Sequence, residues 1–465
     1  MPKSRNRPNR FVPPRKIKLR KHLNADSLIL MTWNHFQTVK DPRSRSNGVT
    51  VADALQSAFA MFSLKDPSLL KFDERRRDDQ EKENLQRVYH IQHVPCDSTM
   101  RQINDRIDPD EAVRPLFREV FRRLQRGKAM EEMSFWNGHY LLDLDGTKVF
   151  SSRKLSSDFC LEKRTRKSGD VLYEVGMLTG AFVQPEKREV IPVCPEFIRK
   201  GDGTEKNDCE QNASARFLKA FRREHPHLRV IVNEDALSAN APHIRLLKAL
   251  KLRHIIVVKP KDHEFLFEWV DLATRDGKAE EFSVRDSKKK SITHRFRIVR
   301  RVPLNASNRD LLVNFVEYWQ EEEGEDGTKK VTYHNTWITD LPVGRMNAIW
   351  FMRGARARWR IENETFNTLK NQGYHLEHNY GLGKRYLFFI FLLLMMLAFL
   401  VDQTQQLCCP LFRAAWKRAG SKTGLWEWMR SLFRCVELDR METMYRAIVY
   451  GMKKGPPQIL EPSSG

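Results

Sequence analysis

Four acidic residues stand where a carboxylate could do chemistry. Asp143 and Asp145 lie two residues apart in the largely apolar segment 140–150, so in a strand both side chains share one face. An acid within an apolar strand raises the free energy unless it is paired or binds a metal. Asp235 follows a second apolar segment, and Glu362 lies far downstream. Carboxylates from separated segments could converge on hard divalent cations such as Mg²⁺, which prefer oxygen ligands.

Each acid also has a simpler interpretation. Asp145 precedes Gly146 and could form a turn, while Asp235 could cap the helix that follows it. Glu362 lies four residues after Arg358, the spacing of an ordinary surface ion pair on a helix. The order and context of the three acids together, rather than any one of them, indicate a two-metal phosphoryl-transfer site.

The composition indicates a polyanionic partner. The 465 residues include 81 Lys and Arg against 59 Asp and Glu, a net charge of +22. Such an excess is the footprint of a protein that meets nucleic acid, although a ribosome-associated protein would show it too. The sequence has no GxxxxGK[ST] loop, so we expect no nucleotide cofactor.

The cysteines and the apolar segments favour a cytoplasmic protein without a membrane anchor. Seven scattered cysteines form no CxxC pair, so neither a zinc site nor a disulfide framework is predicted. The basic N-terminal segment lacks the apolar stretch of a secretory signal. The apolar segment 386–401 is short for a bilayer span, which needs about 20 residues, and is predicted to be a buried helix.

Six segments must position the acids. They are a flexible basic arm (1–25), a helical DNA-binding domain (26–135), the first part of an α/β catalytic core (136–263), a β-rich insertion (264–335), the second part of the core (336–405) and a helical C-terminal unit (406–465).

The spacing of apolar residues and the residues that cap or end helices predict the elements within these segments. Strands are predicted at 140–150, 172–182, 228–232 and 254–258, and strands that alternate with helices indicate an α/β sheet. The charged stretch 72–84 is predicted to be a loop. A capping box formed by Asp208 and Gln211 starts one helix, Pro242 lies at the start of another, and a long helix covers 346–370.

The motifs resemble those of insertion-sequence DDE transposases whose last acid lies in a Tyr–Arg–Glu–Lys signature. The likeness covers most of residues 95–385, and its RWRIE segment is the most specific part. The matching segments are Leu144-Asp145-Gly146-Thr147, Val230-Ile-Val-Asn-Glu-Asp235, Thr339-Asp-Leu-Pro342 and Arg358-Trp359-Arg360-Ile361-Glu362-Asn363.

The resemblance implies a fold and a reaction. It implies an RNase H-like mixed sheet with a β-rich insertion, flanked by N-terminal and C-terminal helical regions. It implies that Asp145, Asp235 and Glu362 hold two Mg²⁺ ions, for which Mn²⁺ can substitute. The expected reaction is nicking and strand transfer at the ends of an insertion sequence, by a homodimer on double-stranded DNA in the nucleoid. The partners would be the terminal repeats and the target DNA.

The DNA contacts are expected near the third acid. By its place in the signature, Arg358 would contact a DNA phosphate, and Trp359 would either stack on a displaced base or pack in the core. Lys259 and Lys370 would neutralise further phosphates. The basic arm and the helical domain would add affinity that weakens with salt.

The sequence also departs from the signature. Its Tyr would fall on Ala355 and its Lys on Leu369, so Lys370 is one residue late. Glu364 competes with Glu362 for the role of third acid. We choose Glu362 because it directly follows RWRI and has the expected spacing from Arg358.

A phosphatase is one alternative. Asp143-Leu-Asp145-Gly-Thr also resembles the first motif of haloacid dehalogenase-type phosphatases, with Asp143 as nucleophile and Asp145 as acid and base. Gly201-Asp202 with Asp208 is similar to their distal acidic motif. No apolar strand precedes Gly201, however, and this function leaves the net charge of +22 unexplained.

A second alternative is not an enzyme. The chain could be a non-catalytic DNA-binding protein derived from a transposase. The presence of all three acids, Asp145, Asp235 and Glu362, argues against that alternative. Metal-dependent cleavage of element ends would distinguish a transposase from a non-catalytic DNA-binding protein.

Overall fold

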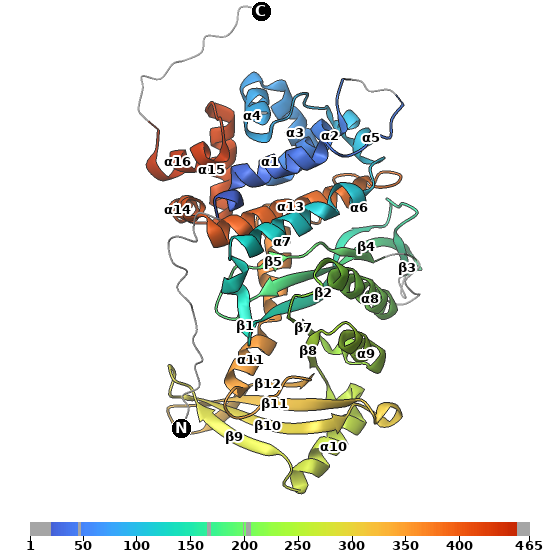
Figure 1. The fold of residues 1–465 in the computed structure, drawn as a ribbon, viewed down its shortest axis with the longest axis vertical. Coiled ribbons are helices and arrows are strands. Elements are labelled where there is room, and N and C mark those ends of the chain that lie inside the picture. Colours follow the sequence, from blue (N-terminus) through green and yellow to red (C-terminus); the bar gives the residue numbers. More distant parts are fainter. Residues whose placement is uncertain (1–19, 45–47, 165–168, 199, 201–205, 453–465) are drawn as a thin grey trace, which may run out of the picture.

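The computed structural model describes residues 20–44, 48–164, 169–198, 200 and 206–452. It is a mixed α/β protein, with N-terminal helices, a 12-stranded mixed sheet and a C-terminal helical region. Figure 1 shows three tiers: helices at the top, the strands nearest to β2 in the middle, and strands β9–β12 with helix α10 at the bottom.

The strands form one sheet in the order β3-β4-β2-β7-β8-β12-β11-β10-β9, with β1, β5 and β6 attached beside this path. The pairs β2–β7 and β7–β8 are parallel, and the other pairs are antiparallel. All four predicted strands are confirmed, as β2, β4, β7 and β8. The strands are β1 (Ser134–Trp136), β2 (His139–Ser152), β3 (Leu161–Arg164), β4 (Val171–Val183), β5 (Ile191–Pro192), β6 (Glu196–Ile198), β7 (Val230–Glu234), β8 (Arg253–Val257), β9 (Glu280–Arg285), β10 (Ile292–Pro303), β11 (Leu312–Glu323) and β12 (Lys329–Thr339).

Strand β2 separates an apolar face from an acidic one. Leu142 and Leu144 face helix α8 (Lys206–Glu224), which packs so tightly that a Cβ on Gly180 of β4 would lie 2.7 Å from Phe217 of that helix. Since side chains alternate along a strand, the two aspartates of β2 point to the opposite face. Helix α11 (Ala348–Arg356) and the π-helix η7 (Ile361–Phe366) lie on that face.

The predicted insertion has different limits and a different relation to the core. Its first part is helix α10 (Glu264–Arg275), in which Leu266 and Val270 are buried at helical spacing. The strands then run to Thr339, and β12 pairs with β8, Trp337 opposite Val257. The segment therefore extends the central sheet, and its high charge concealed the helical period of α10.

The stretch 72–84 is helical, so the predicted loop was wrong. It lies in α3 (Leu69–Arg77) and α4 (Asp79–Tyr89), and Asp78 caps α4. Buried Arg75 pairs with Asp66 at 2.7 Å and also with Glu81. These ion pairs satisfy charges that otherwise favour a solvated loop.

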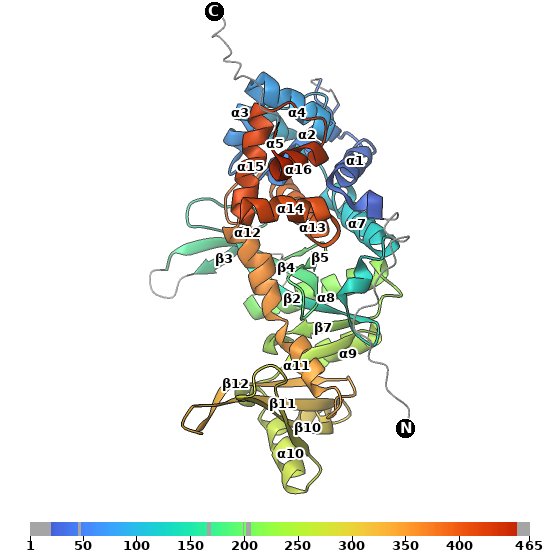
Figure 2. The same cartoon turned by 90° about the vertical axis from the view of Figure 1, so that its left-hand side faces the viewer.

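Three other predicted boundaries are corrected. Helix α8 begins at Lys206, before Asp208. The predicted helix 346–370 is interrupted, with α11, η7 and α12 (Asn367–Asn371) forming a column from the lower strands to the upper helices (Figure 2). Most of the predicted flexible arm lies outside the described residues, but its end is held, because Arg20 pairs with Glu132 at 2.7 Å.

The N-terminal and C-terminal helices form a single tier. Asn84 of α4 donates to the carbonyls of Phe433 and Val436, across most of the chain length. Helix α13 (Leu387–Cys408) lies in the core, as predicted for 386–401. Among the described helices it alone is long and apolar enough to cross a membrane, and it is buried within the protein. The remaining helices are α1 (Ala25–Phe36), α2 (Val51–Ser63), α5 (Asp97–Asn104), α6 (Pro109–Ala112), α7 (Arg114–Arg126), α9 (Ala241–Ala249), α14 (Pro410–Ala419), α15 (Lys422–Cys435) and α16 (Met441–Tyr450), with short 3-10 turns at η2 (Met130–Met133), η4 (Ala236–Ser238), η5 (Pro260–Asp262) and η6 (Ala306–Asn308).

Candidate functional site

Asp145 lies on β2, opposite Thr179 of β4. Its Oδ1 accepts a hydrogen bond from the N–H of Gly146 at 2.9 Å. Burial raises the pKa of Asp145 to about 6, Arg358 opposes this rise, and the negative charges of Glu362 and Asp235 add to it. The pKa of Asp145 therefore responds to both of the other predicted acids.

Asp235 lies at the carboxyl end of β7, beside β2. The parallel pairing of β2 with β7 explains how two segments 90 residues apart reach the same part of the sheet. The exposed side chain of Asp235 caps η4, because its Oδ1 accepts from the N–H of Leu237 at 3.0 Å. Asp235 therefore caps a short 3-10 turn, whereas the following helix α9 is capped by Asn240.

Glu362 enters the site from η7, which packs on β2 and β4. Its Oε1 accepts from Nη2 of Arg358 at 2.8 Å, so the predicted ion pair is present. The same guanidinium reaches Oδ2 of Asp145 through Nη1 at 3.4 Å. A π-helix is rare and often marks a functional position. Glu364 instead interacts electrostatically with Arg360.

Arg358 interacts with all three acids. Burial disfavours its charged form, but Asp145, Glu362 and Asp235 together hold the pKa of Arg358 above its ordinary value. Arg358 therefore contacts carboxylates from β2 and η7, and Asp235 at the end of β7 acts on it electrostatically without a direct contact. The two contacts of Arg358 are the central feature of the site.

Neither a family model nor a curated protein matches the chain.

The donor types of the three acids suit a hard divalent cation, but their positions do not form a metal site. Asp145, Asp235 and Glu362 supply only carboxylate oxygens, the ligands that Mg²⁺ and Mn²⁺ prefer. Within the described residues, no group of three or more His, Cys, Asp or Glu side chains stands close enough together to hold a metal ion. The guanidinium of Arg358 pairs with both Asp145 and Glu362 and supplies the positive charge between them.

Asp143 lies next to the site but is fully buried. Its Oδ1 accepts from Nδ2 of Asn233 at 2.9 Å, and burial raises the pKa of Asp143 to about 8. A phosphatase nucleophile must contact its substrate, so this burial argues against the haloacid dehalogenase-type alternative. Gly201 and Asp202 of the supposed distal motif, and the side chain of Asp208, lie outside the described residues.

The predicted DNA-binding residues have different surroundings. Trp359 is 46% exposed, so its interpretation as a core residue was wrong. Lys259 is exposed just after β8, which parallels β7 and so ends at the same edge of the sheet as Asp235. Lys370 pairs with Glu377 at 2.8 Å rather than with the acids of the site.

The sequence analysis missed a second buried pair at the end of β7. Oε2 of Glu234 lies 2.6 Å from Nε2 of His243, and its Oε1 accepts from the hydroxyls of Ser238 at 3.1 Å and Ser214 at 3.4 Å. These bonds hold the backbone immediately before Asp235. The sequence signal was Glu234 itself, an acid at the end of an apolar strand and directly before Asp235.

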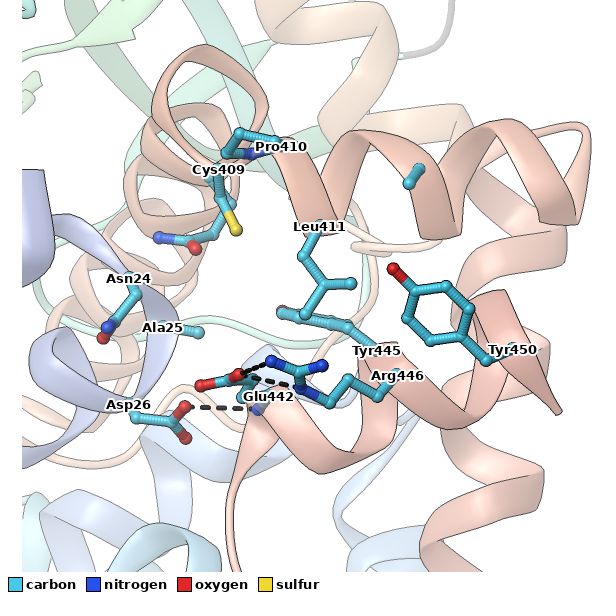
Figure 3. Close-up of a pocket in the computed structure, with 12 residues that line it drawn as sticks. Asn24, Ala25, Asp26, Cys409, Pro410, Leu411, Glu442, Tyr445, Arg446 and Tyr450 are labelled. Carbon is cyan, nitrogen blue, oxygen red and sulfur yellow. Dashed lines mark hydrogen bonds and ion pairs between the residues drawn. The ribbon is translucent and has the colours of Figure 1, made fainter. Parts of the chain in front are cut away.

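A cavity of about 530 Å³ lies elsewhere, between α1, α14 and α16 (Figure 3). Leu411, Tyr445 and Tyr450 supply apolar walls, and Glu442 with Arg446 supplies an ion pair. None of the three candidate acids lines this cavity. Its volume therefore does not identify it with the carboxylate site.

Proposed function

We propose that the protein is a DDE-type DNA transposase with an RNase H-like core, which nicks DNA at the ends of an insertion sequence and transfers the strands. The observation that carries this proposal is the contact of Arg358 with both Asp145 and Glu362, with Asp235 at the end of the neighbouring strand β7. The central strands β2, β7 and β8 are parallel and β4 is antiparallel to β2, an arrangement compatible with that core.

The three acids would hold two Mg²⁺ ions, or Mn²⁺ in their place. Such ions supply activation of the attacking oxygen and stabilisation of the leaving oxygen in phosphoryl transfer. Asp145 lies on β2 and Asp235 follows β7, its parallel neighbour, while Glu362 of η7 shares Arg358 with Asp145.

Arg358 and Trp359 would bind the DNA strand beside the acids. In the free protein Arg358 neutralises Asp145 and Glu362, and a DNA phosphate offers the same guanidinium another anionic partner. The exposed ring of Trp359 can stack on an unpaired base, a contact worth about 1–3 kcal/mol. Exposed Lys259 would neutralise a phosphate at the same sheet edge, and Lys370 would do so after leaving Glu377.

The net charge of +22 supports double-stranded DNA as the partner, both the terminal repeats and the target. Two ends must be held together for transposition, so we propose a homodimer on DNA. The corresponding place of action is the nucleoid, in the cytoplasm.

Cleavage of a labelled duplex tests the proposal. The duplex carries the element's own end, and the reaction contains Mg²⁺ or Mn²⁺. We expect Glu362→Gln to lose cleavage by about a hundredfold or more while it still binds the duplex. The matched control is Glu364→Gln, two residues away and directed to Arg360, which should cleave like the wild type.

Other outcomes have definite meanings. Equal cleavage by the wild type and Glu362→Gln, with loss in Glu364→Gln, moves the third acid to Glu364. Duplex binding without cleavage by the wild type contradicts the enzyme and favours a DNA-binding protein derived from a transposase.

A further inference from the structure

A buried pair joins the two strands that carry Asp145 and Asp235. Asp143 of β2 and Asn233 of β7 are directly opposite each other in the parallel register, and both are fully buried. Nδ2 of Asn233 donates to Oδ1 of Asp143 at 2.9 Å. Each residue is two positions before one of the predicted metal ligands. The hydrogen bond between the two strands therefore lies next to the site, two residues before Asp145 and Asp235 on the same two segments.

The same amide also reaches the helix that leads to the third acid. Nδ2 of Asn233 lies 3.3 Å from the carbonyl oxygen of Gly354 and 3.5 Å from that of Ala355, both in α11. Helix α11 packs closely against β1 as well, because a Cβ on Gly354 would overlap the ring of Phe135. Since α11 ends at Arg356, its placement sets where Arg358 and then η7 begin.

We propose that the Asp143–Asn233 pair is a positioning device for the carboxylate site. One amide connects β2, which carries Asp145, with β7, which Asp235 follows, and with α11, which leads to Arg358 and Glu362. The inference rests on the proposed function, because it requires the three acids to bind metal together. Asp143 is not itself a ligand in this proposal, since its carboxyl is enclosed between the sheet and α11.

The alternative role for the Asp143–Asn233 pair is to stabilise the fold. A buried polar pair is a weak source of stability, because an apolar replacement of similar volume is often neutral. Among the described residues, Oδ2 of Asp143 and Oδ1 of Asn233 have no hydrogen-bond partner. Because buried polar atoms without partners destabilise the folded state, the pair contributes little to the stability of the protein. The pair does fix the direction of the Asn233 amide between two strands and α11.

The experiment measures Mn²⁺ binding to the full chain by electron paramagnetic resonance, without DNA. Asp143→Asn keeps an oxygen that accepts from Asn233, whereas Asp143→Leu has similar volume and no acceptor. We expect Asp143→Leu to raise the half-saturating Mn²⁺ concentration about tenfold, and Asp143→Asn to stay within about threefold of the wild type. The matched control is Thr179→Val, an isosteric change on β4 in the same sheet face, which should bind as the wild type does. The Thr179 hydroxyl has no hydrogen-bond partner among the described residues.

Unfolding in denaturant separates positioning from folding. The double variant Asp143→Leu with Asn233→Leu should bind Mn²⁺ more weakly than Asp143→Leu alone, because it also removes the contact of the Asn233 amide with the carbonyls of α11. All variants should retain cooperative unfolding with midpoints near that of the wild type.

Three results overturn the inference. Wild-type Mn²⁺ affinity in Asp143→Leu removes the positioning role. Equal losses in Asp143→Asn and Asp143→Leu make Asp143 a ligand or a folding residue instead. A wild type that binds no Mn²⁺ refutes the proposed metal site and with it the role of the pair, whereas intact Mn²⁺ binding without DNA cleavage refutes only the transposase.

Discussion

At the scale of single residues, removal of Arg358 tests whether its guanidinium and a metal ion compete for the same carboxylate oxygens. It pairs with Asp145 at 3.4 Å and with Glu362 at 2.8 Å, so it competes with any cation for those oxygens. Partly exposed ion pairs contribute about 0.5–1 kcal/mol each, so loss of both favours metal binding by about tenfold. We therefore expect Arg358→Gln to bind Mn²⁺ about tenfold more tightly without DNA, yet to cleave DNA more slowly. Mn²⁺ titration and single-turnover cleavage measure the two effects.

A neighbouring arginine provides the control for this prediction. Arg356 lies over the ring of Tyr333 at 4.2 Å and donates to Gln320, away from the acids. Arg356→Gln should leave Mn²⁺ affinity unchanged. If Arg358→Gln and Arg356→Gln bind Mn²⁺ equally, Arg358 does not compete with metal at this site.

The acids of the candidate site could be predicted from the sequence, but their supports could not. Asp145 and Asp235 stood out because a carboxylate beside an apolar strand needs a reason. Asn233 carries no charge and directly follows a short apolar run, so its role depends on a strand register that sequence alone does not give. The exposure of Trp359 likewise depends on where α11 ends, which no local pattern determined.

At the scale of elements, the contact between α7 and α8 contains a pH-sensitive group. Burial against Phe121 and Phe221, with Arg222 and Arg118 nearby, lowers the pKa of His225 to about 4. An unfolded histidine titrates near 6.5, so between about pH 6.5 and pH 4 the unfolded state binds more protons. This contribution to the free energy of unfolding therefore falls as the pH falls, by up to about 1.4 kcal/mol per pH unit. We expect His225→Phe to remove that dependence, measured by urea unfolding at pH 7, 6 and 5.

The exposed His227 makes this prediction specific to the helix contact. His227→Phe should keep the pH dependence of the wild type. A wild type and His225→Phe with the same slope between pH 7 and pH 5 would show that His225 protonates freely in the folded protein.

Regular elements were predictable where burial and period agreed. Strands β2, β4, β7 and β8 have apolar sequences of strand length, and all four were predicted. Helices α3 and α4 were not, because their stability comes from ion pairs such as Arg75–Asp66, which bring together residues nine positions apart. Pairing of β12 with β8 is a tertiary event as well, so the sequence suggested a separate insertion instead of a continuous sheet.

At the scale of the whole molecule, the question is which surface meets DNA. Helix α7 is strongly amphipathic: Leu116, Val120 and Leu124 are buried, while arginines occupy the outer side. Exposed Arg118, Arg122 and Arg126 recur every four residues, so they form a stripe about 12 Å long. A row of guanidinium groups at this spacing suits the phosphates of a DNA strand.

The final prediction separates this stripe from general charge attraction. We expect the triple change Arg118→Gln, Arg122→Gln and Arg126→Gln to reduce the slope of log affinity against log salt by about two to three units, because each lost phosphate contact removes about 0.9. The control is the triple change to Gln at Lys288, Lys289 and Lys290, in the exposed β9–β10 turn of the lowest tier (Figure 1). It removes the same charge and should change the slope by less than about one unit. Fluorescence anisotropy with a labelled duplex, over a range of KCl concentrations, gives both slopes. Equal reductions would mean that the molecule attracts DNA through its overall charge, with no preferred contact on α7.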